Sequence, residues 1–306
     1  MTASIDGTPA SAAPGAAAGG ALRGARVLIP RGGTWGTRVA AEVARRGAEP
    51  IVAPLITSAP PRDEAARDRY FAALAAGEYA WVFVTSAATV EQLVLQGVTI
   101  PPTTRIAAVG AATARAVAAT GAEVAFVPTG ESSAAALAAQ WLGGQGSARR
   151  TPTDTGRTLV IRSDLGAAVL SDELALRGFA VDVCIGYRTL GVDLAPEVLH
   201  DLTGGEIDVV LLTSLSVARE LRRQAGPLPA SVRVASIGPG TTRDAERIGY
   251  TVAHTARTQS VDALLAELDA APTASPRHPY ASSPHRASPH TSETPSDSRP
   301  DQEASS

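Results

Sequence analysis

Four short motifs of this sequence have residue types that bind anions, and they form two matching pairs. Thr85-Ser86 and Thr213-Ser214 each follow an apolar run that is typical of a buried strand. Gly110-x-x-Thr113 and Gly238-x-x-Thr241 each follow the next apolar run and begin a predicted helix. Glycine lets the backbone approach a ligand, and the free N–H groups of the first helical turn point toward it. The threonine hydroxyls can bind that ligand or cap their helices, and the sequence leaves both roles open.

The paired motifs belong to one internal repeat. Thr85 and Thr213 lie 128 residues apart, and the same spacing relates Arg105 to Arg233, Arg115 to Arg243 and Ser132 to Ser260 without a gap. In the preceding part of each copy, Arg31 ends the run "VLIPR" as Arg162 ends "LVIR". An ungapped register of this length predicts two homologous lobes.

Short apolar runs separated by segments of helical spacing predict the elements that position these motifs. The runs cover residues 26–31, 48–56, 79–86, 105–110, 122–128, 158–163, 180–189, 208–214, 233–238 and 250–255. Strands that are apolar on both faces are typical of parallel sheets covered by helices on either side. The sequence therefore predicts an α/β fold in which helices flank parallel sheets.

The composition excludes several kinds of protein. The formal net charge of −3, without a basic tract, argues against nucleic acid as a partner. The chain has no lysine, which removes P-loop and Schiff-base chemistry, and "GPGTTR" has Arg243 where a dinucleotide fingerprint needs glycine. A single cysteine, Cys184, excludes a multi-cysteine metal site and is predicted to be a buried core thiol.

The two ends are predicted to be disordered tails. Residues 1–21 lack the basic start and apolar core of a signal peptide, and residues 271–306 are rich in proline, serine and threonine. His278, His285 and His290 lie in the second tail, where a solvated role is expected. No run approaches the length of a membrane span, so we expect a cytoplasmic protein that does not bind membranes.

An ordered series of segments resembles the uroporphyrinogen-III synthase family. The series is "VLIPR", "WVFVTSAATVEQL", "IAAVGAATA", "LVIRSD", "VCIGYRT", "VVLLTSLSV" and "VASIGPGTT", and it covers roughly residues 26–269. The resemblance implies two similar lobes, each a parallel sheet flanked by helices, joined by a pair of extended linkers with a cleft between. One lobe would comprise residues 22–54 with 188–270 and the other residues 55–187. Two lobes sequential in the chain would also fit the repeat.

The resemblance also implies an activity. The family's substrate is hydroxymethylbilane, a linear tetrapyrrole with acetate and propionate carboxylates on every ring. The enzyme removes the terminal hydroxyl as water, closes the macrocycle and inverts the last pyrrole to give uroporphyrinogen III, with no cofactor and no metal. Without the enzyme, the chain closes to the symmetric type I isomer. A lyase of this kind, acting as a monomer on a small molecule, is the expected function.

The family's site residues can be assigned to this sequence one at a time. Tyr187 matches the tyrosine proposed to assist loss of the hydroxyl, and Ser214 and Thr241 match residues expected to bind substrate carboxylates. Arg31 and Arg162 are placed to pair with carboxylates. The other residues expected to bind substrate are Thr85, Ser86, Gly110, Thr113, Ser163, Ser216, Gly238 and Thr242.

The sequence departs from the family in one of these loops. Members commonly have two threonines after Gly-Pro, whereas Gly240 takes the first of these places here and Thr242 follows Thr241. Two other functions fit less well. A non-catalytic tetrapyrrole-binding regulator of the same fold is the main alternative, and a nucleotide- or sugar-binding protein is disfavoured because the fingerprints are missing.

Overall fold

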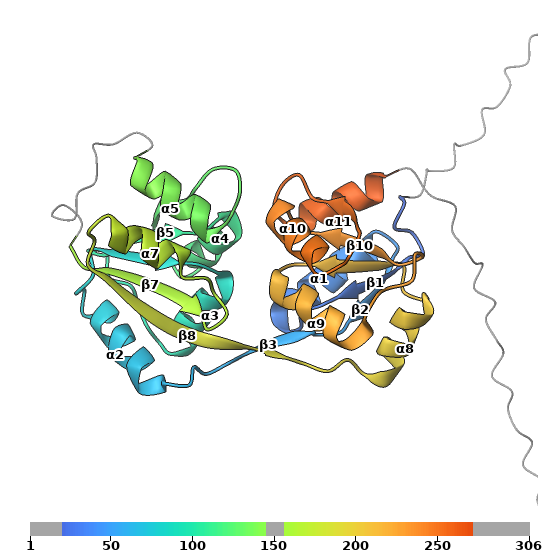
Figure 1. Cartoon of the computed structure of the whole chain (residues 1–306), viewed down its shortest axis with the longest axis horizontal. Coiled ribbons are helices and arrows are strands. Elements are labelled where there is room, and N and C mark those ends of the chain that lie inside the picture. The colour runs from blue at the N-terminus through green and yellow to red at the C-terminus, as the bar shows by residue number, and fades with distance from the viewer. Residues whose placement is uncertain (1–19, 145–155, 272–306) are drawn as a thin grey trace, which may run out of the picture. The chain divides into compact units, whose positions relative to one another are not determined.

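The structure is a computed structural model of the chain and describes residues 20–144 and 156–271. Two sheets flanked by helices make up the described part, which confirms the predicted α/β class (Figure 1). The predicted tails lie outside the described residues, except for residues 20, 21 and 271, and so do the three tail histidines. No helix of the described ranges is long and apolar enough to cross a membrane.

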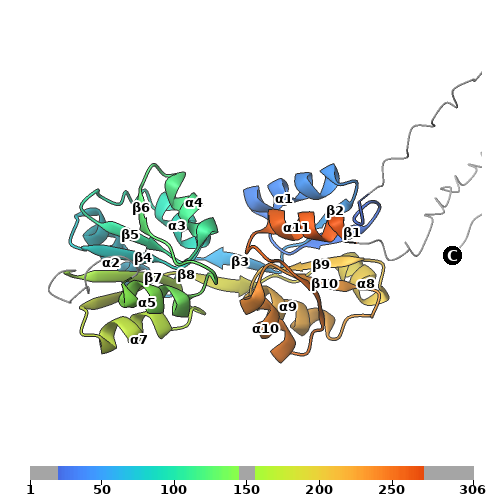
Figure 2. The same ribbon diagram turned by 90° about the horizontal axis from the view of Figure 1, so that it is seen from above.

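The first sheet has the strand order β11-β10-β9-β1-β2, and all its pairs are parallel. Its strands are β1 (Arg26–Ile29), β2 (Glu49–Val52), β9 (Val209–Leu212), β10 (Arg233–Ser236) and β11 (Val252–Thr255). One face packs against α1 (Gly33–Arg45) and α11 (Val261–Ala270), and the other packs against α8 (Pro196–Gly204), α9 (Leu215–Ala225) and α10 (Pro239–Arg247) (Figure 2). Two separate apolar cores result, one on each face of the sheet.

The second sheet has the order β3-β8-β7-β4-β5-β6 and is parallel except for the β3–β8 pair. Its strands are β3 (Ile56–Ala59), β4 (Trp81–Val84), β5 (Arg105–Ala108), β6 (Val124–Phe126), β7 (Thr158–Ser163) and β8 (Val181–Gly191). Residues of α2 (Glu64–Ala75), α3 (Ala87–Leu95) and α4 (Ala111–Ala118) share one core, and those of α5 (Ala134–Gly143) and α7 (Val169–Leu176) share the other.

Strand β4 shows why the strands lack a polar face. Val82 and Val84 point into the core shared with α2, α3 and α4, whereas Trp81 and Phe83 point into the core shared with α5 and α7. Trp141 of α5 lies edge-on to both aromatic rings, with ring centroids 5.3 Å from Trp81 and 5.1 Å from Phe83. Because every residue of this strand is buried, alternation disappears and the sequence becomes a continuous apolar run.

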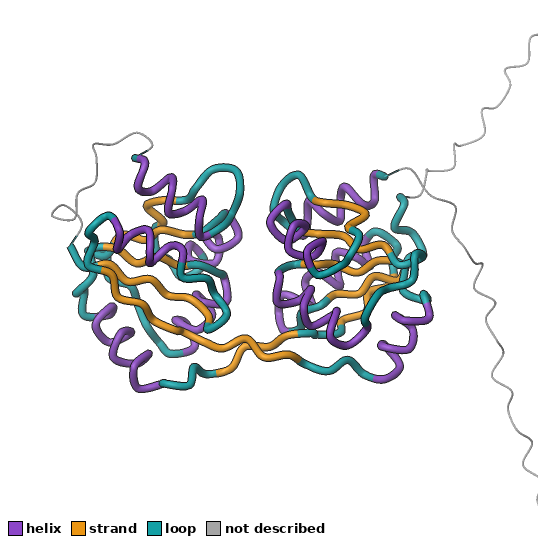
Figure 3. Tube along the Cα trace, in the orientation of Figure 1, coloured by secondary structure: helices purple, strands orange, loops and turns teal. Residues whose placement is uncertain are grey.

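Within the described residues, the first two and the last three strands form the first sheet, and the strands between them form the second. The chain leaves the first sheet after β2 through β3 and returns through β8. These two segments pair in antiparallel register, from Ile56 with Gly191 to Ala59 with Arg188. They are the two orange strands that run together at the lower centre of Figure 3. The predicted linkers are therefore hydrogen-bonded to each other, and β8 continues beyond the run expected at 180–189.

Each sheet has one switch point, the place where the order of the strands along the sheet reverses direction. In the first sheet it lies between β1 and β9, and in the second between β7 and β4. Ligands of open α/β sheets bind at the carboxyl ends of the strands beside such a point. Arg31 and Thr213 follow the two strands at the first of these points, and Arg162 and Thr85 are at the second.

Candidate active site

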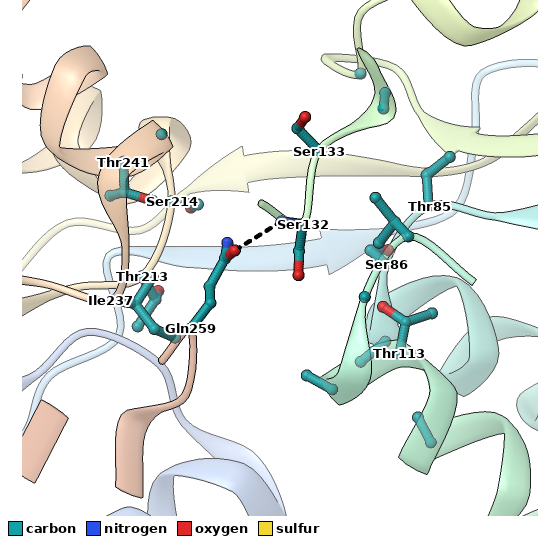
Figure 4. A pocket seen from close by; sticks show the side chains of 18 of the residues that line it. Thr85, Ser86, Thr113, Ser132, Ser133, Thr213, Ser214, Ile237, Thr241 and Gln259 are labelled. Carbon is teal, nitrogen blue, oxygen red and sulfur yellow. Dashed lines mark hydrogen bonds between the residues drawn. The ribbon is translucent and has the colours of Figure 1, made fainter. Parts of the chain in front are cut away.

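A cavity of about 1220 Å³ is lined by the loops at both of these points. Its wall includes loops that follow β1, β9, β10 and β11 of the first sheet. From the second sheet come residues that follow β4, β5, β6 and β7, together with Tyr187 of β8. The predicted anion-binding motifs from both copies of the repeat therefore face one space (Figure 4).

Most of the predicted site residues line this cavity. Those on its wall are Arg31, Thr85, Ser86, Gly110, Thr113, Arg162, Ser163, Tyr187, Ser214 and Thr241. Ser216, Gly238 and Thr242 are not on the wall. The structure therefore brings together ten of the thirteen residues that the sequence nominated.

Local packing explains the position of the three other residues. Ser216 lies inside α9, one residue beyond the wall residue Leu215. Gly238 is the N-cap of α10, where its carbonyl oxygen accepts the N–H of Thr242. The hydroxyl of Thr242 lies 2.6 Å from that of Thr255 on β11, so it is used inside the protein and does not replace the hydroxyl lost at Gly240.

Tyr187 and Ser86 are joined by their hydroxyl groups. Their oxygens lie 2.9 Å apart, and either atom can donate. Ser86 also caps α3, because its Oγ accepts the backbone N–H of Thr89 at 3.1 Å. Tyr187 is only 7% exposed, so its ring is fixed in the wall while its hydroxyl is held by a residue that begins a helix. Such a hydroxyl is positioned before any ligand arrives.

The surroundings of Tyr187 keep its phenol protonated. Burial raises the pKa of Tyr187 above its ordinary value of 10.0, because the charged phenolate loses its solvation. Hydrogen bonds from Ser86 and Ser163 and the charge of Arg31 act in the opposite direction and lower the pKa, but burial is the larger cause. The group is therefore a neutral hydrogen-bond donor at pH 7.

The helices that follow the Gly-x-x-Thr motifs are capped by glycine. The N-caps of α4 and α10 are Gly110 and Gly238, and neither makes a side-chain cap hydrogen bond. The idea that Thr113 and Thr241 are N-caps is therefore wrong. Both threonines are buried in the first helical turn, and within residues 20–144 and 156–271 no hydrogen bond is found for either hydroxyl. Their hydroxyls are available to a ligand in the cavity.

Close packing explains the glycine at position 110. A Cβ atom added there would lie 2.1 Å from Oγ of Ser132, which belongs to the loop before α5. The backbone of this position is extended, a conformation open to any residue, so space and not strain is the reason. The absence of a side chain lets the β6–α5 loop close against the start of α4 and form one wall of the cavity.

The charged side chains of the wall are mostly arginine. They comprise Arg31, Arg38, Arg115, Arg162, Arg243 and Arg247, against Glu91, Glu131, Asp244 and Asp262. Arg31 lies over the ring of Trp35, with 5.1 Å between its Cζ and the ring centroid. Arg162 donates to the backbone oxygens of Gly166 and Ser163. The wall therefore has more positive than negative groups, which suits an anionic ligand.

Two contacts connect the loops of the two sheets across the cavity. Arg243 of α10 donates to both carboxylate oxygens of Glu131, at 2.9 and 3.1 Å. The backbone N–H of Ser132 donates to Oε1 of Gln259 at 3.0 Å (Figure 4). The repeat marked Arg243, because it pairs this residue with Arg115. The contacts themselves could not be predicted, because they depend on how the two loops meet.

No set of three histidine, cysteine, aspartate or glutamate side chains within the described ranges is arranged to hold a metal ion. The cavity wall instead offers hydroxyls, helix N-termini and guanidinium groups. These groups can bind carboxylates and supply a proton donor.

The chain is similar to one protein family over most of its length. The sequence model of the uroporphyrinogen-III synthase HemD family matches residues 37–266. The crystal structure of a mutant uroporphyrinogen III synthase from the bacterium Thermus thermophilus matches with a TM-score of 0.53 and 20% identity, over 79% of this chain and 96% of that chain. The uroporphyrinogen-III synthetase from Helicobacter pylori matches with a TM-score of 0.51 and 13% identity, over 80% of this chain and 97% of that chain. Comparison with curated proteins gave no match.

The two solved structures support the fold, and the family match, which spans well over half of the chain, supports the assignment. The chain belongs to the uroporphyrinogen-III synthase family, lyases that cyclise hydroxymethylbilane.

Proposed function

We propose that the cavity is where this chain binds hydroxymethylbilane and closes it to uroporphyrinogen III. The observation that carries the proposal is the convergence of both switch-point loops, with ten sequence-predicted residues, on one cavity of about 1220 Å³. Most of the work of such an enzyme is geometric, because the substrate also closes unaided to the wrong isomer. The wall must hold the two reacting ends in one arrangement.

The carboxylates of the substrate are matched by donors from both sheets. Arg31 and Arg162 supply guanidinium groups at the two switch points, and the first turns of α4 and α10 supply backbone N–H groups. Thr113 and Thr241 add hydroxyls in the same turns. The hydroxyl of Thr85 contributes less, because it donates to the backbone oxygen of Ile161 at 3.0 Å.

Tyr187 is the group that assists loss of the hydroxyl. When the C–O bond of the hydroxymethyl group breaks, the electron pair leaves with oxygen, and a proton must reach that oxygen to give water. A protonated phenol can donate a hydrogen bond there. Ser86 can donate to the oxygen of Tyr187 at 2.9 Å, which frees the phenolic proton for the substrate. In this arrangement Ser86 is a positioning residue.

The lobes are assigned as residues 22–54 with 188–270 and residues 55–187. The strand order of both sheets supports this division, and its second boundary falls inside β8. A monomer in the cytoplasm remains the expected state. Light scattering of the purified protein tests the expected monomer.

Arg31→Ala tests the location of the site. The variant should raise KM for hydroxymethylbilane about 3- to 10-fold while the product remains type III, because one guanidinium that pairs with a carboxylate is removed. Arg219→Ala is the matched control, since Arg219 is exposed on α9 and is not on the cavity wall. Equal KM values for the two variants would contradict the assignment of this cavity.

A further inference from the structure

We propose that Arg115 binds a carboxylate of the substrate, while its counterpart in the repeat, Arg243, holds the two loops together. This inference rests on the proposed function of the cavity. It adds a substrate-binding residue at a position where the sequence indicated only that the repeat has an arginine. The argument comes from the ion pairs of the wall and from the difference between the two copies of the repeat.

Half of the wall arginines are already neutralised by carboxylates of the same wall. Arg38 pairs with Asp262 at 2.7 Å, Arg243 with Glu131 at 2.9 Å, and Arg247 with Asp244 at 2.9 Å. Arg31, Arg115 and Arg162 have no carboxylate partner within the described parts of the chain. Two of these three were nominated by the sequence, and Arg115 is the third.

Arg115 has the least occupied guanidinium of the three. Arg31 lies over Trp35, and Arg162 donates to two backbone oxygens. Across residues 20–144 and 156–271, no hydrogen bond or ion pair is found for the side chain of Arg115, which is exposed. A long cationic side chain without a protein partner can adapt to a ligand at little cost.

The surroundings of Arg115 on α4 leave room for that ligand. Beyond Thr113, the other residues of α4 and its C-cap that line the cavity are Ala112, Ala116 and Ala119, which have the spacing of one helix face. Small side chains along this face let a large ligand approach the helix. Arg115 is the one charged residue of α4 on the wall, two positions after Thr113.

The two copies of the repeat differ at the position whose side chain can pair with the arginine of the other copy. Glu131 neutralises Arg243, whereas the repeat partner of Glu131 is Gln259. Gln259 carries no charge and uses Oε1 to accept the N–H of Ser132 at 3.0 Å. The first copy therefore supplies the carboxylate that holds Arg243, and the second copy supplies none for Arg115. This difference assigns one arginine to the contact between the loops and the other to the ligand.

Three variants test the proposal in the full chain. Arg115→Ala should raise KM for type III formation about 3- to 10-fold, and Arg115→Lys should recover part of the loss because the charge remains. Arg69→Ala is the control, since Arg69 is also an exposed helical arginine, on α2, and is not on the cavity wall. The KM of Arg115→Ala should also depend less on salt concentration than that of the unmodified protein, because one charge pair with the substrate is missing.

A second measurement separates a direct role from a structural one. Gln259→Glu keeps an acceptor for Ser132 and adds a charge to the wall, so it should raise KM in the unmodified protein. If the carboxylate introduced by Gln259→Glu acts by pairing with Arg115, the effect of Gln259→Glu on KM should be at least threefold smaller in the Arg115→Ala background than in the unmodified protein. The thermal unfolding temperature of Arg115→Ala should match that of Arg69→Ala, because neither side chain has an ion pair among the described residues.

The outcomes distinguish this proposal from the proposed function. If the unmodified protein forms type III and Arg115→Ala has the KM and salt dependence of Arg69→Ala, the inference about Arg115 is wrong and the function stands. If Arg31→Ala and Arg115→Ala both leave KM unchanged while the unmodified protein still forms type III, the assignment of the cavity is wrong and the inference fails with it. A KM raised in Arg115→Ala and partly recovered in Arg115→Lys would establish the proposal.

Discussion

The hydroxyl oxygens of Tyr187 and Ser86 lie 2.9 Å apart, although 101 residues separate them in the chain. Tyr187 belongs to β8, and Ser86 follows β4, with β7 between the two strands. The parallel order of these strands brings the residue that starts α3 beside the tyrosine at the edge of the linker. The pair joins a proton donor to a helix cap, so its geometry is fixed by the fold.

Tyr187→Phe should lower kcat about 100-fold and change KM less than about threefold. The variant keeps the ring that packs in the wall and removes only the hydroxyl that assists departure of water. Stopped-time assays of type III formation at several substrate concentrations give both constants. Tyr250→Phe is the control, because Tyr250 is also buried but does not line the cavity. An unchanged kcat in Tyr187→Phe would remove the residue from the mechanism.

Ser86→Ala and Ser214→Ala should separate capping from catalysis. Each serine caps a helix, since Ser86 accepts from Thr89 and Ser214 accepts from Val217, so each variant should lose about 1 kcal/mol of stability. Of these two serines, Ser86 is the one that bonds Tyr187, so Ser86→Ala and not Ser214→Ala should lower kcat, by about tenfold. Ser214→Ala should instead raise the KM for hydroxymethylbilane, because Ser214 lines the cavity and is expected to bind a substrate carboxylate. Chemical denaturation and steady-state kinetics check both expectations, and equal kcat values in the two variants would be inconsistent with a positioning role for Ser86.

Thr241→Val should raise KM about 3- to 5-fold and leave thermal stability unchanged. Threonine and valine have nearly the same shape, and no hydrogen bond of the Thr241 hydroxyl is found within the described residues. Thr113→Val is the matched variant in the other copy of the repeat and should behave in the same way. A lower unfolding temperature with an unchanged KM would show that the hydroxyl stabilises the helix instead of binding substrate.

Stability should fall as the pH rises above about 9. Burial raises the pKa of Cys184 from 9.0 to about 12 and that of Tyr250 from 10.0 to about 12, and it also raises the pKa of Tyr187. The unfolded chain then loses protons that the native chain keeps, so the stabilisation is complete below these ordinary pKa values and decreases above them. The slope should be about 1.4 kcal/mol per pH unit for each group that is deprotonated only in the unfolded chain.

Urea unfolding between pH 7 and 11, in the presence of a reductant, measures this slope. Cys184→Ala removes one of the contributing groups and should give a shallower decline above pH 9. A free energy of unfolding that stays constant up to pH 11 would contradict the expected retention of these protons.

The central strands were predictable because burial on both faces leaves a continuous apolar run in the sequence. Each of the ten predicted runs overlaps a strand, as with β10 at 233–236 inside the run at 233–238. The missed strand is β3, which has the sequence "ITSA" and two exposed residues. It forms because β8 extends beyond its pairing with β7 and offers a partner to β3, and this long-range pairing leaves no apolar run in the sequence.

The site was predictable where the repeat places matching residues after matching strands. Arg31 and Arg162 are such a pair, and both line the cavity. Thr242 was nominated from its position in the loop, but its hydroxyl bonds Thr255 on the neighbouring strand, a contact that spacing does not show. The difference between Arg115 and Arg243 also could not be predicted, because it depends on Glu131 reaching across to the other copy of the repeat.

The isomer of the product tests the central claim most directly. The purified protein is given freshly made hydroxymethylbilane, the products are oxidised, and types I and III are separated by chromatography. The account predicts mostly type III, formed faster than the substrate closes in buffer. Only type I, at the rate of buffer alone and with protein shown to be folded, would contradict it.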